Sequence, residues 1–189
     1  ELYGGRKTVF ISAIEHPCVM ESAKRLEFLG FAVKQIPVDP EGMIVLESYK
    51  AMLSAAASSA RLEDRPLLVS VMMANNEIGT IQDIRLLSSL AHEAGALFHT
   101  DAVQAAGKIP VDVKALDVDY LTLSAHKIYG PKGVGALYVK KGAPLESFIK
   151  GGHQEKGLRA GTYNSPSIIA FGEAARLAAE GLNDYEASL

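Results

Sequence analysis

The sequence has 189 residues, which suits one large domain or two small ones. Hydrophobic residues make up 48% and charged residues 22%, so the chain can bury a core and is not intrinsically disordered as a whole. With 19 lysines and arginines against 22 aspartates and glutamates, the net charge is −3, and nothing in it favours nucleic acid or an anionic membrane as a partner.

The single cysteine and the lack of targeting segments indicate a cytoplasmic protein. Cys18 stands alone and cannot form an internal disulfide. No apolar run approaches the ~20 residues of a membrane helix, and residues 1–12 lack the pattern of a signal peptide. The chain begins at Glu1, a few residues before a strand that reads as an interior one, so we expect a fragment of a larger domain.

Short β-rich apolar runs alternate with longer segments of helical periodicity. In chain order the predicted elements are a strand at 8–12, a helix at 17–29, a strand at 31–36, a helix at 46–58, strands at 67–73 and 96–101 with a helix at 83–94 between them, strands at 120–124 and 135–139, and a last helix at 164–180. The run 67–73 is apolar nearly throughout, which is typical of a parallel strand covered on both faces. We predict an α/β fold of three layers, α/β/α, with a mostly parallel sheet.

Polar residues stand at the carboxyl ends of several predicted strands, where ligands collect in open α/β sheets. Asn76 follows the strand at 67–73, Asp101 ends the next one with Gln104 close behind, and Lys127 follows the strand at 120–124. We expect these residues to meet at one edge of the sheet.

Asp101 and Lys127 alone could form either a structural ion pair or part of a reactive site. Ser124, His126 and Gly130 surround the lysine. A short polar, glycine-rich turn lets a backbone approach a phosphate closely, which favours the second interpretation. Lys127 is therefore a candidate nucleophile.

Five sequence blocks extend this pattern in a fixed order. They are Glu15-His16, Asn75-Asn76-Glu77-Ile78-Gly79, His99-Thr100-Asp101-Ala102-Val103-Gln104, the segment from Ser124 through His126-Lys127 to Gly135, and Gly151-Gly152-His153-Gln154-Glu155 with Arg159-Ala160-Gly161-Thr162. Together they resemble the signature segments of cysteine desulfurases, in the class V aminotransferase family. The resemblance implies the pyridoxal-phosphate-binding large domain of fold type I, with 1–189 as a truncated piece of it that lacks the upstream phosphate turn and the C-terminal small domain.

The resemblance also implies a catalytic set bound to pyridoxal 5'-phosphate. Lys127 would form the Schiff base with the cofactor aldehyde. Asp101 would keep the pyridine nitrogen protonated, and His16 would stack on the ring and handle protons. Read without the other blocks, His16 would simply cap a helix.

Five further residues would bind the cofactor in the family pattern. Gln104 and Asn76 would lie beside the phenolic oxygen of the ring. Ser124 and His126 would hold the phosphate, and Thr162 would reach the phosphate of the partner subunit in a homodimer. The alternative for the asparagine segment is an ordinary turn, and for the glycine pair before Thr162 a surface loop.

The reaction implied by the resemblance removes sulfur from L-cysteine to give L-alanine and an enzyme persulfide, for iron–sulfur cluster or thio-cofactor assembly by acceptor or scaffold proteins. Selenocysteine lyase, or another class V carbon–sulfur lyase or aminotransferase, shares the same blocks. The acceptor cysteine and the substrate-binding arginine of the family fall downstream of residue 189, so we expect residues 1–189 alone to be inactive. Cys18, which we expect to be at least half-buried on a helix, is no substitute.

Two interpretations from other classes remain. His99, Asp101 and His126 are ligand types that a metal-dependent hydrolase could use, although we expect no metal site. The chain could also be a non-catalytic scaffold fragment.

Overall fold

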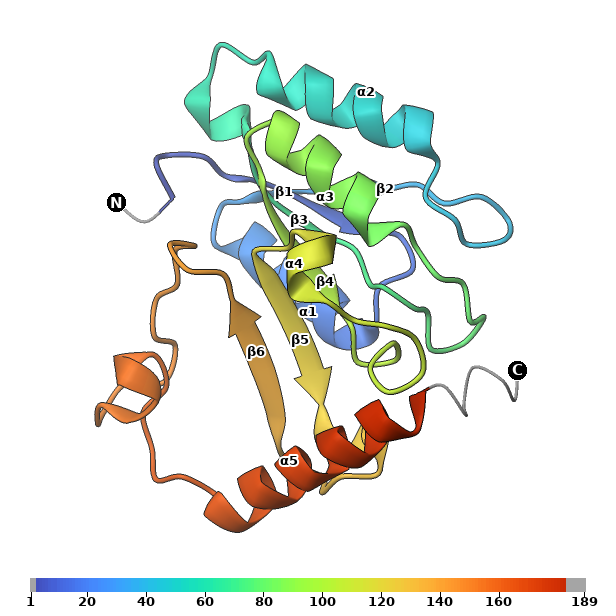
Figure 1. Ribbon diagram of the computed structural model, residues 1–189. Coiled ribbons are helices and arrows are strands. Elements are labelled where there is room, and N and C mark those ends of the chain that lie inside the picture. The colour runs from blue at the N-terminus through green and yellow to red at the C-terminus, as the bar shows by residue number, and fades with distance from the viewer. Residues whose placement is uncertain (1–2, 183–189) are drawn as a thin grey trace.

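The computed structural model describes residues 3–182 as a six-stranded sheet flanked by helices (Figure 1). The strands are β1 (Thr8–Ser12), β2 (Ala32–Ile36), β3 (Pro66–Ser70), β4 (Leu97–Asp101), β5 (Tyr120–Ser124) and β6 (Gly135–Val139). The helices are α1 (Pro17–Phe28), α2 (Leu46–Ala57), α3 (Ile84–Glu93), α4 (Val113–Leu116) and α5 (Ser165–Glu180), with short 3-10 helices η1 (Leu62–Asp64), η2 (Ala125–Ile128) and η3 (Gln154–Gly157).

The sheet has the strand order β2-β1-β3-β4-β5-β6. Strands β1 to β5 are parallel to one another, and β6 runs antiparallel to β5. The predicted α/β class with a mostly parallel sheet is therefore confirmed. β1 is an interior strand, as its apolar sequence predicts, and all five of its residues are buried.

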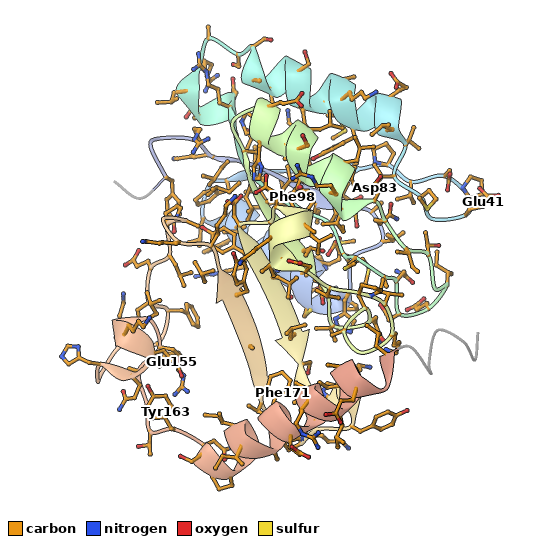
Figure 2. The ribbon with its side chains drawn as sticks, in the orientation of Figure 1. Glu41, Asp83, Phe98, Glu155, Tyr163 and Phe171 are labelled. Carbon is orange, nitrogen blue, oxygen red and sulfur yellow. The ribbon has the colours of Figure 1, made fainter. Side chains whose placement is uncertain are left out.

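The core lies on both faces of the sheet. On one face α2 and α3 cover the larger cluster, which includes Phe10, Tyr49 and Phe98, and Figure 2 shows Phe98 between the sheet and these helices. On the other face α1 packs Ala23 against Val9 and a few neighbours. The two clusters give the three layers predicted from the sequence.

Capping residues mark the helix starts. Asp83 accepts the N–H of Leu86 at 3.0 Å at the start of α3, and Asn164 accepts the N–H of Ser167 at 3.4 Å at the start of α5. Both side chains satisfy backbone donors that have no partner within the helix. The helix boundaries predicted from these signals differ from the observed ones by only a residue or two.

Strand β3 ends earlier than its apolar run predicts, at Ser70 instead of residue 73. The N–H of Met72 donates to the side chain of Glu15 instead of to a neighbouring strand. At Met72 a side-chain acceptor thus takes the place of a strand carbonyl. Val71 and Met73 on either side still donate to carbonyls of β4.

Helix α4 and the position of Cys18 differ from expectation. Asp112 caps α4 by accepting the N–H of Lys114 at 2.8 Å, and Asp117 ends this single turn in the left-handed region at φ 54°. Cys18 is exposed, so the expectation of a half-buried thiol is wrong. It lies in the first turn of α1, which leaves its side chain near the helix end.

A charged cluster lies at the amino end of β5. Asp119 is buried and accepts both the N–H of Phe98 and the ring of His92 at 2.8 Å. Lys140 bonds Asp117 at 2.6 Å nearby. The cluster lies at the end of the strands away from Asp101 and stabilises the fold there.

Across residues 3–182, no helix is both long and apolar enough to cross a membrane.

Candidate active site

The carboxyl ends of β4 and β5 lie side by side. Asp101, the last residue of β4, is in register with Thr122 of β5, and Ser124 ends β5 two residues later. Beyond Ser124 the chain passes directly into η2, which carries His126 and Lys127. Asp101 and the turn that bears Lys127, both predicted to lie at one sheet edge, are therefore on neighbouring strand ends.

The turn that carries Lys127 is tightly built. The Ser124 hydroxyl and the His126 Nδ1 are 2.8 Å apart, and Lys127 is exposed beside them. Gly130 donates its N–H to the Ala125 carbonyl at 2.9 Å, and a Cβ added at Gly130 would lie 2.9 Å from that same oxygen. The turn needs glycine there because no side chain fits against the carbonyl.

The same turn connects β5 and β6 and is closed by their ladder. Ser124 is in register with Gly135, the first residue of β6. A Cβ added at Gly135 would lie 2.5 Å from the Leu123 carbonyl oxygen, so this position also requires glycine. The glycines predicted to permit a close backbone approach thus serve first to close the hairpin.

Asp101 is 7% exposed, and its Oδ1 accepts the N–H of Val103 at 2.9 Å. This bond starts a turn that continues through Gln104 to Lys108. The Gln104 Oε1 accepts a hydrogen bond from the Lys108 Nζ at 3.1 Å. Burial lowers the pKa of Lys108, and the charge of Lys127 lowers it further, which indicates that the two lysines are neighbours.

His16 and Cys18 lie at the start of α1. The His16 Nδ1 accepts the N–H of Cys18 at 3.2 Å and lies 3.0 Å from the Cys18 Sγ. Although Cys18 is exposed as a residue, partial desolvation of its thiol raises the thiol pKa, and the charge of Asp101 raises it further. His16 therefore caps α1, as its simpler interpretation predicts, and Cys18 beside it lies within electrostatic range of Asp101.

Glu15, directly before His16, is a buried carboxyl group. Its Oε1 accepts the Ser12 hydroxyl at 2.5 Å and the Met72 N–H at 2.6 Å. Its Oε2 is buried with no hydrogen-bond partner among the described residues. Burial raises the pKa of Glu15 to about 7, against the two hydrogen bonds, and the charge of Asp101 acts in the same direction as burial.

The two asparagines that follow β3 have different environments. The Asn75 Nδ2 donates to the Ile14 carbonyl at 2.9 Å, and its Oδ1 accepts the N–H groups of Glu77 and Ile78 at 2.8 and 3.0 Å. Asn76 is exposed next to it. Asn75 therefore shapes the turn, and Asn76 is presented to solvent by it.

Both ring nitrogens of His99 face hydroxyl groups of neighbouring strands. Its Nδ1 lies 2.8 Å from the Ser70 hydroxyl, and its Nε2 lies 3.4 Å from the Thr122 hydroxyl. Burial lowers the pKa of His99 to about 4. Within residues 3–182, no three histidine, cysteine, aspartate or glutamate side chains are grouped so that they could hold a metal ion.

Thr162 lies away from these strand ends in the segment between η3 and α5, and it is exposed. The segment is folded on itself. The Gln154 Oε1 accepts the N–H of Gly161 at 3.1 Å, and the N–H of Glu155 donates to the Tyr163 hydroxyl at 2.9 Å; Figure 2 shows Glu155 and Tyr163 in this segment. Among the described residues, no side-chain hydrogen bond joins Thr162 to the turn that carries Ser124 and His126.

A cavity of about 470 Å³ adjoins the site between η2, the turn before Lys108 and α5. Lys108 and Lys127 line it, with Glu173 and apolar residues of α5 opposite. Asp101, Gln104 and His16 are not part of its lining. We therefore define the site by the strand ends and treat the cavity as its neighbour.

Two residues at the site were not given a role from the sequence. Glu15 and Lys108 each contact a predicted site segment, one beside His16 and the other on Gln104. The available signals were a glutamate next to a strand-end histidine and a lysine four residues after a glutamine. Neither signal distinguishes a buried or bonded side chain from a solvated one.

Comparison with known proteins gives a consistent assignment. Residues 3–188 match the family model described as Aminotransferase class-V. A cysteine desulfurase of Sinorhizobium fredii is 48% identical over 174 residues, which cover 92% of this chain and 43% of that protein. The chain thus spans less than half the length of this relative.

Two solved structures resemble the fold closely. One, described as a NifS-like protein, has a TM-score of 0.86 and 42% identity and covers 95% of this chain and 47% of its own. The other, described as SspA in complex with cysteine, has a TM-score of 0.80 and 36% identity. The match covers 90% of this chain and 47% of that one.

Proposed function

Because the chain belongs to the aminotransferase class-V family, we propose that it forms the cofactor-binding part of a pyridoxal-phosphate-dependent cysteine desulfurase. The single observation that carries this proposal is the register of β4 and β5, in which buried Asp101 neighbours the turn bearing Ser124, His126 and Lys127. The relatives named as cysteine desulfurases support the choice within the family.

The groups at the strand ends fit pyridoxal phosphate chemically. Lys127 offers an exposed primary amine that would hold the aldehyde covalently. Asp101 offers a carboxylate with one oxygen held by the Val103 N–H, and it would keep a proton on the pyridine nitrogen. A hydroxyl and an imidazole within one turn, Ser124 and His126, would donate to the phosphate.

When bound, pyridoxal phosphate supplies an electron sink for negative charge at the substrate α-carbon. Asp101 would maintain that capacity by pairing with the protonated ring nitrogen. Gln104 and Asn76 would orient the ring through its phenolic oxygen. His16 would lie over the ring and carry a proton, and Thr162 would serve the phosphate site of a partner subunit.

The net reaction we propose converts L-cysteine to L-alanine. The carbon–sulfur bond of the substrate breaks, a proton replaces sulfur on carbon, and the sulfur bonds to an enzyme thiol as a persulfide. We further propose that the enzyme is a cytoplasmic homodimer that passes this sulfur to acceptor or iron–sulfur scaffold proteins. Relatives named as NifS and IscS desulfurases support this context.

The test uses the full-length protein. Borohydride reduction after incubation with pyridoxal phosphate should attach the cofactor to the peptide that contains Lys127, as read by mass spectrometry. Lys127→Ala should abolish both this adduct and the visible absorbance band. Lys132→Ala, which removes an exposed lysine from the same loop, should leave both intact. Lack of any adduct, or an adduct that survives Lys127→Ala, contradicts the proposal.

The substrate is tested separately, by sulfide and alanine release from L-cysteine in the presence of a thiol reductant. Selenide release from L-selenocysteine measures the competing lyase activity. We expect sulfide release to exceed background and to depend on Lys127. Turnover of L-selenocysteine without turnover of L-cysteine would assign the chain to the lyase class.

A further inference from the structure

Lys108 holds Gln104 through two hydrogen bonds. Its Nζ lies 3.0 Å from the Gln104 backbone carbonyl and 3.1 Å from the side-chain Oε1. An ammonium group has three donors and no acceptor, so the amide atom that faces it must be the oxygen. The amide NH₂ of Gln104 is therefore turned away from Lys108 and is free to donate elsewhere.

The backbone fixes the position of Lys108. Gly107 adopts φ +73°, and a Cβ at Gly107 would lie 3.0 Å from both the Ala178 Cβ and the Ile128 Cγ2. The turn is thus pressed between η2 and α5, where only glycine fits. The N–H of Lys108 also donates to the Ala105 carbonyl at 3.0 Å, which completes the turn.

Lys108 is partly buried beside a cavity, and the hydrogen-bond partners of its Nζ among the described residues are both on Gln104. It lines the cavity of about 470 Å³ together with Lys127. Its bonds to Gln104 replace part of the hydration that an ammonium group loses on burial. The two hydrogen bonds to Gln104 are consequently part of the folded turn, unlike the single contacts of solvated side chains at a surface.

We propose that Lys108 is a positioning residue that sets the orientation of the Gln104 amide, so that its NH₂ group faces the ligand at the strand ends. The inference rests on the proposed function, in which Gln104 donates to the phenolic oxygen of the cofactor. Lys108 itself does not touch the ligand. Without it, the amide can rotate or flip, and its oxygen would then face a phenolate oxygen that needs a donor.

The experiment measures pyridoxal phosphate affinity in full-length protein carrying Lys108→Met, which keeps the chain length but removes the donors. We expect the Kd to rise about tenfold and Lys108→Arg to restore part of the loss. Lys132→Met, which removes an exposed lysine nearby, should leave the Kd unchanged. In a Gln104→Ala background, Lys108→Met should change the Kd by less than about twofold, because the two residues act as a unit.

The pH dependence of the absorbance of the bound cofactor gives a second readout. Loss of a correctly oriented donor disfavours deprotonation, so its midpoint should move upward in Lys108→Met. A purely structural role would lower the melting temperature and leave this midpoint unmoved. An unchanged Kd and midpoint in Lys108→Met, or a full additional loss in the Gln104→Ala background, overturns the inference.

Crystal structures without cofactor separate this inference from the proposed function. If the unaltered protein takes up no pyridoxal phosphate, the proposed function fails. The position of the Gln104 side chain still tests Lys108 in that case. We expect one ordered rotamer on Lys108 in the unaltered protein and a displaced or multiple rotamer in Lys108→Met. The same Gln104 rotamer in both would overturn the positioning role.

Discussion

Glu15 and Met72 are joined across two strand ends, because the Glu15 Oε1 accepts the Met72 backbone N–H at 2.6 Å. The bond ties the β1–α1 turn, which carries His16, to the end of the apolar run of β3. It also buries a carboxyl group whose second oxygen has no hydrogen-bond partner within the described chain. Burial accordingly raises the pKa of Glu15 from 4.5 to about 7.

This shift predicts that Glu15 makes stability fall as the pH rises from about 4.5 to about 7. The unfolded chain loses its proton at the lower pH and the folded protein at the higher one. Between them the folded state holds the extra proton, so removing protons favours unfolding. Above about pH 7 the penalty is complete and constant.

Glu15→Gln removes this titration. The difference in unfolding free energy between the variant and the unaltered protein should shift in favour of the variant as the pH rises from about 5 to about 8. We expect a shift on the order of 2 kcal/mol, measured by urea denaturation. Glu27→Gln, at an exposed position on α1, is the control and should show no such shift. A pH-independent difference for Glu15→Gln would mean that Glu15 is ionised in the folded protein.

Asp101→Asn should separate binding from turnover in the full-length enzyme. The asparagine oxygen can still accept the Val103 N–H, so the turn should persist and cofactor affinity should change little. Without the carboxylate the ring nitrogen loses its ionic partner, and kcat should fall at least about a hundredfold. Titration with pyridoxal phosphate and steady-state kinetics test both parts. Equal losses in affinity and kcat, or none in either, would contradict this role and leave Asp101 with a structural role in the turn that starts at Val103.

Cys18 should not act as the sulfur acceptor. Desolvation of the thiol and the charge of Asp101 raise its pKa, and the residue is fixed in the first turn of α1, so it is not a thiolate poised for attack on a mobile loop. Cys18→Ser, which can keep a hydrogen bond to His16, should retain sulfide release in the full-length enzyme. We also expect no sustained release from residues 1–189 alone, where Cys18 is the only thiol. Turnover that disappears in Cys18→Ser would contradict this assignment.

Asp119→Ala should destabilise the fold without affecting the site. Asp119 is buried and accepts both the Phe98 N–H and the His92 ring at 2.8 Å. Removing the acceptor leaves a buried N–H without a partner, and the unfolding free energy should drop by about 2–4 kcal/mol. Asp119→Asn, which keeps an acceptor, should cost less. Because the cluster lies at the opposite end of the strands from Asp101, cofactor affinity at a temperature where the protein is folded should stay unchanged.

The fold could be predicted because its signals are local. Apolar runs such as β1 mark the strands, and Asp83 and Asn164 mark helix starts through their own side-chain bonds. The end of β3 could not be predicted from its apolar run, since it depends on the Glu15 side chain, distant in sequence. Helix α4 is a single turn and has too few residues to show periodicity.

Part of the candidate site could likewise be predicted from the sequence, and part could not. Asp101 and the Ser124–Lys127 turn follow from polar residues at the ends of neighbouring parallel strands. Glu15 and Lys108 matter through burial and contacts that only the tertiary structure reveals. The roles given by resemblance to all of the site residues stay predictions. Asn76, His16 and Thr162 are in addition exposed, with only local contacts where they have any.

The register of Ser124 with Gly135 has a thermodynamic consequence for ligand binding. The loop bearing Lys127 is ordered when the β5–β6 hairpin forms, so its loss of conformational entropy belongs to folding. A ligand that meets this loop would then immobilise little additional chain, and more of its interaction energy would remain as affinity.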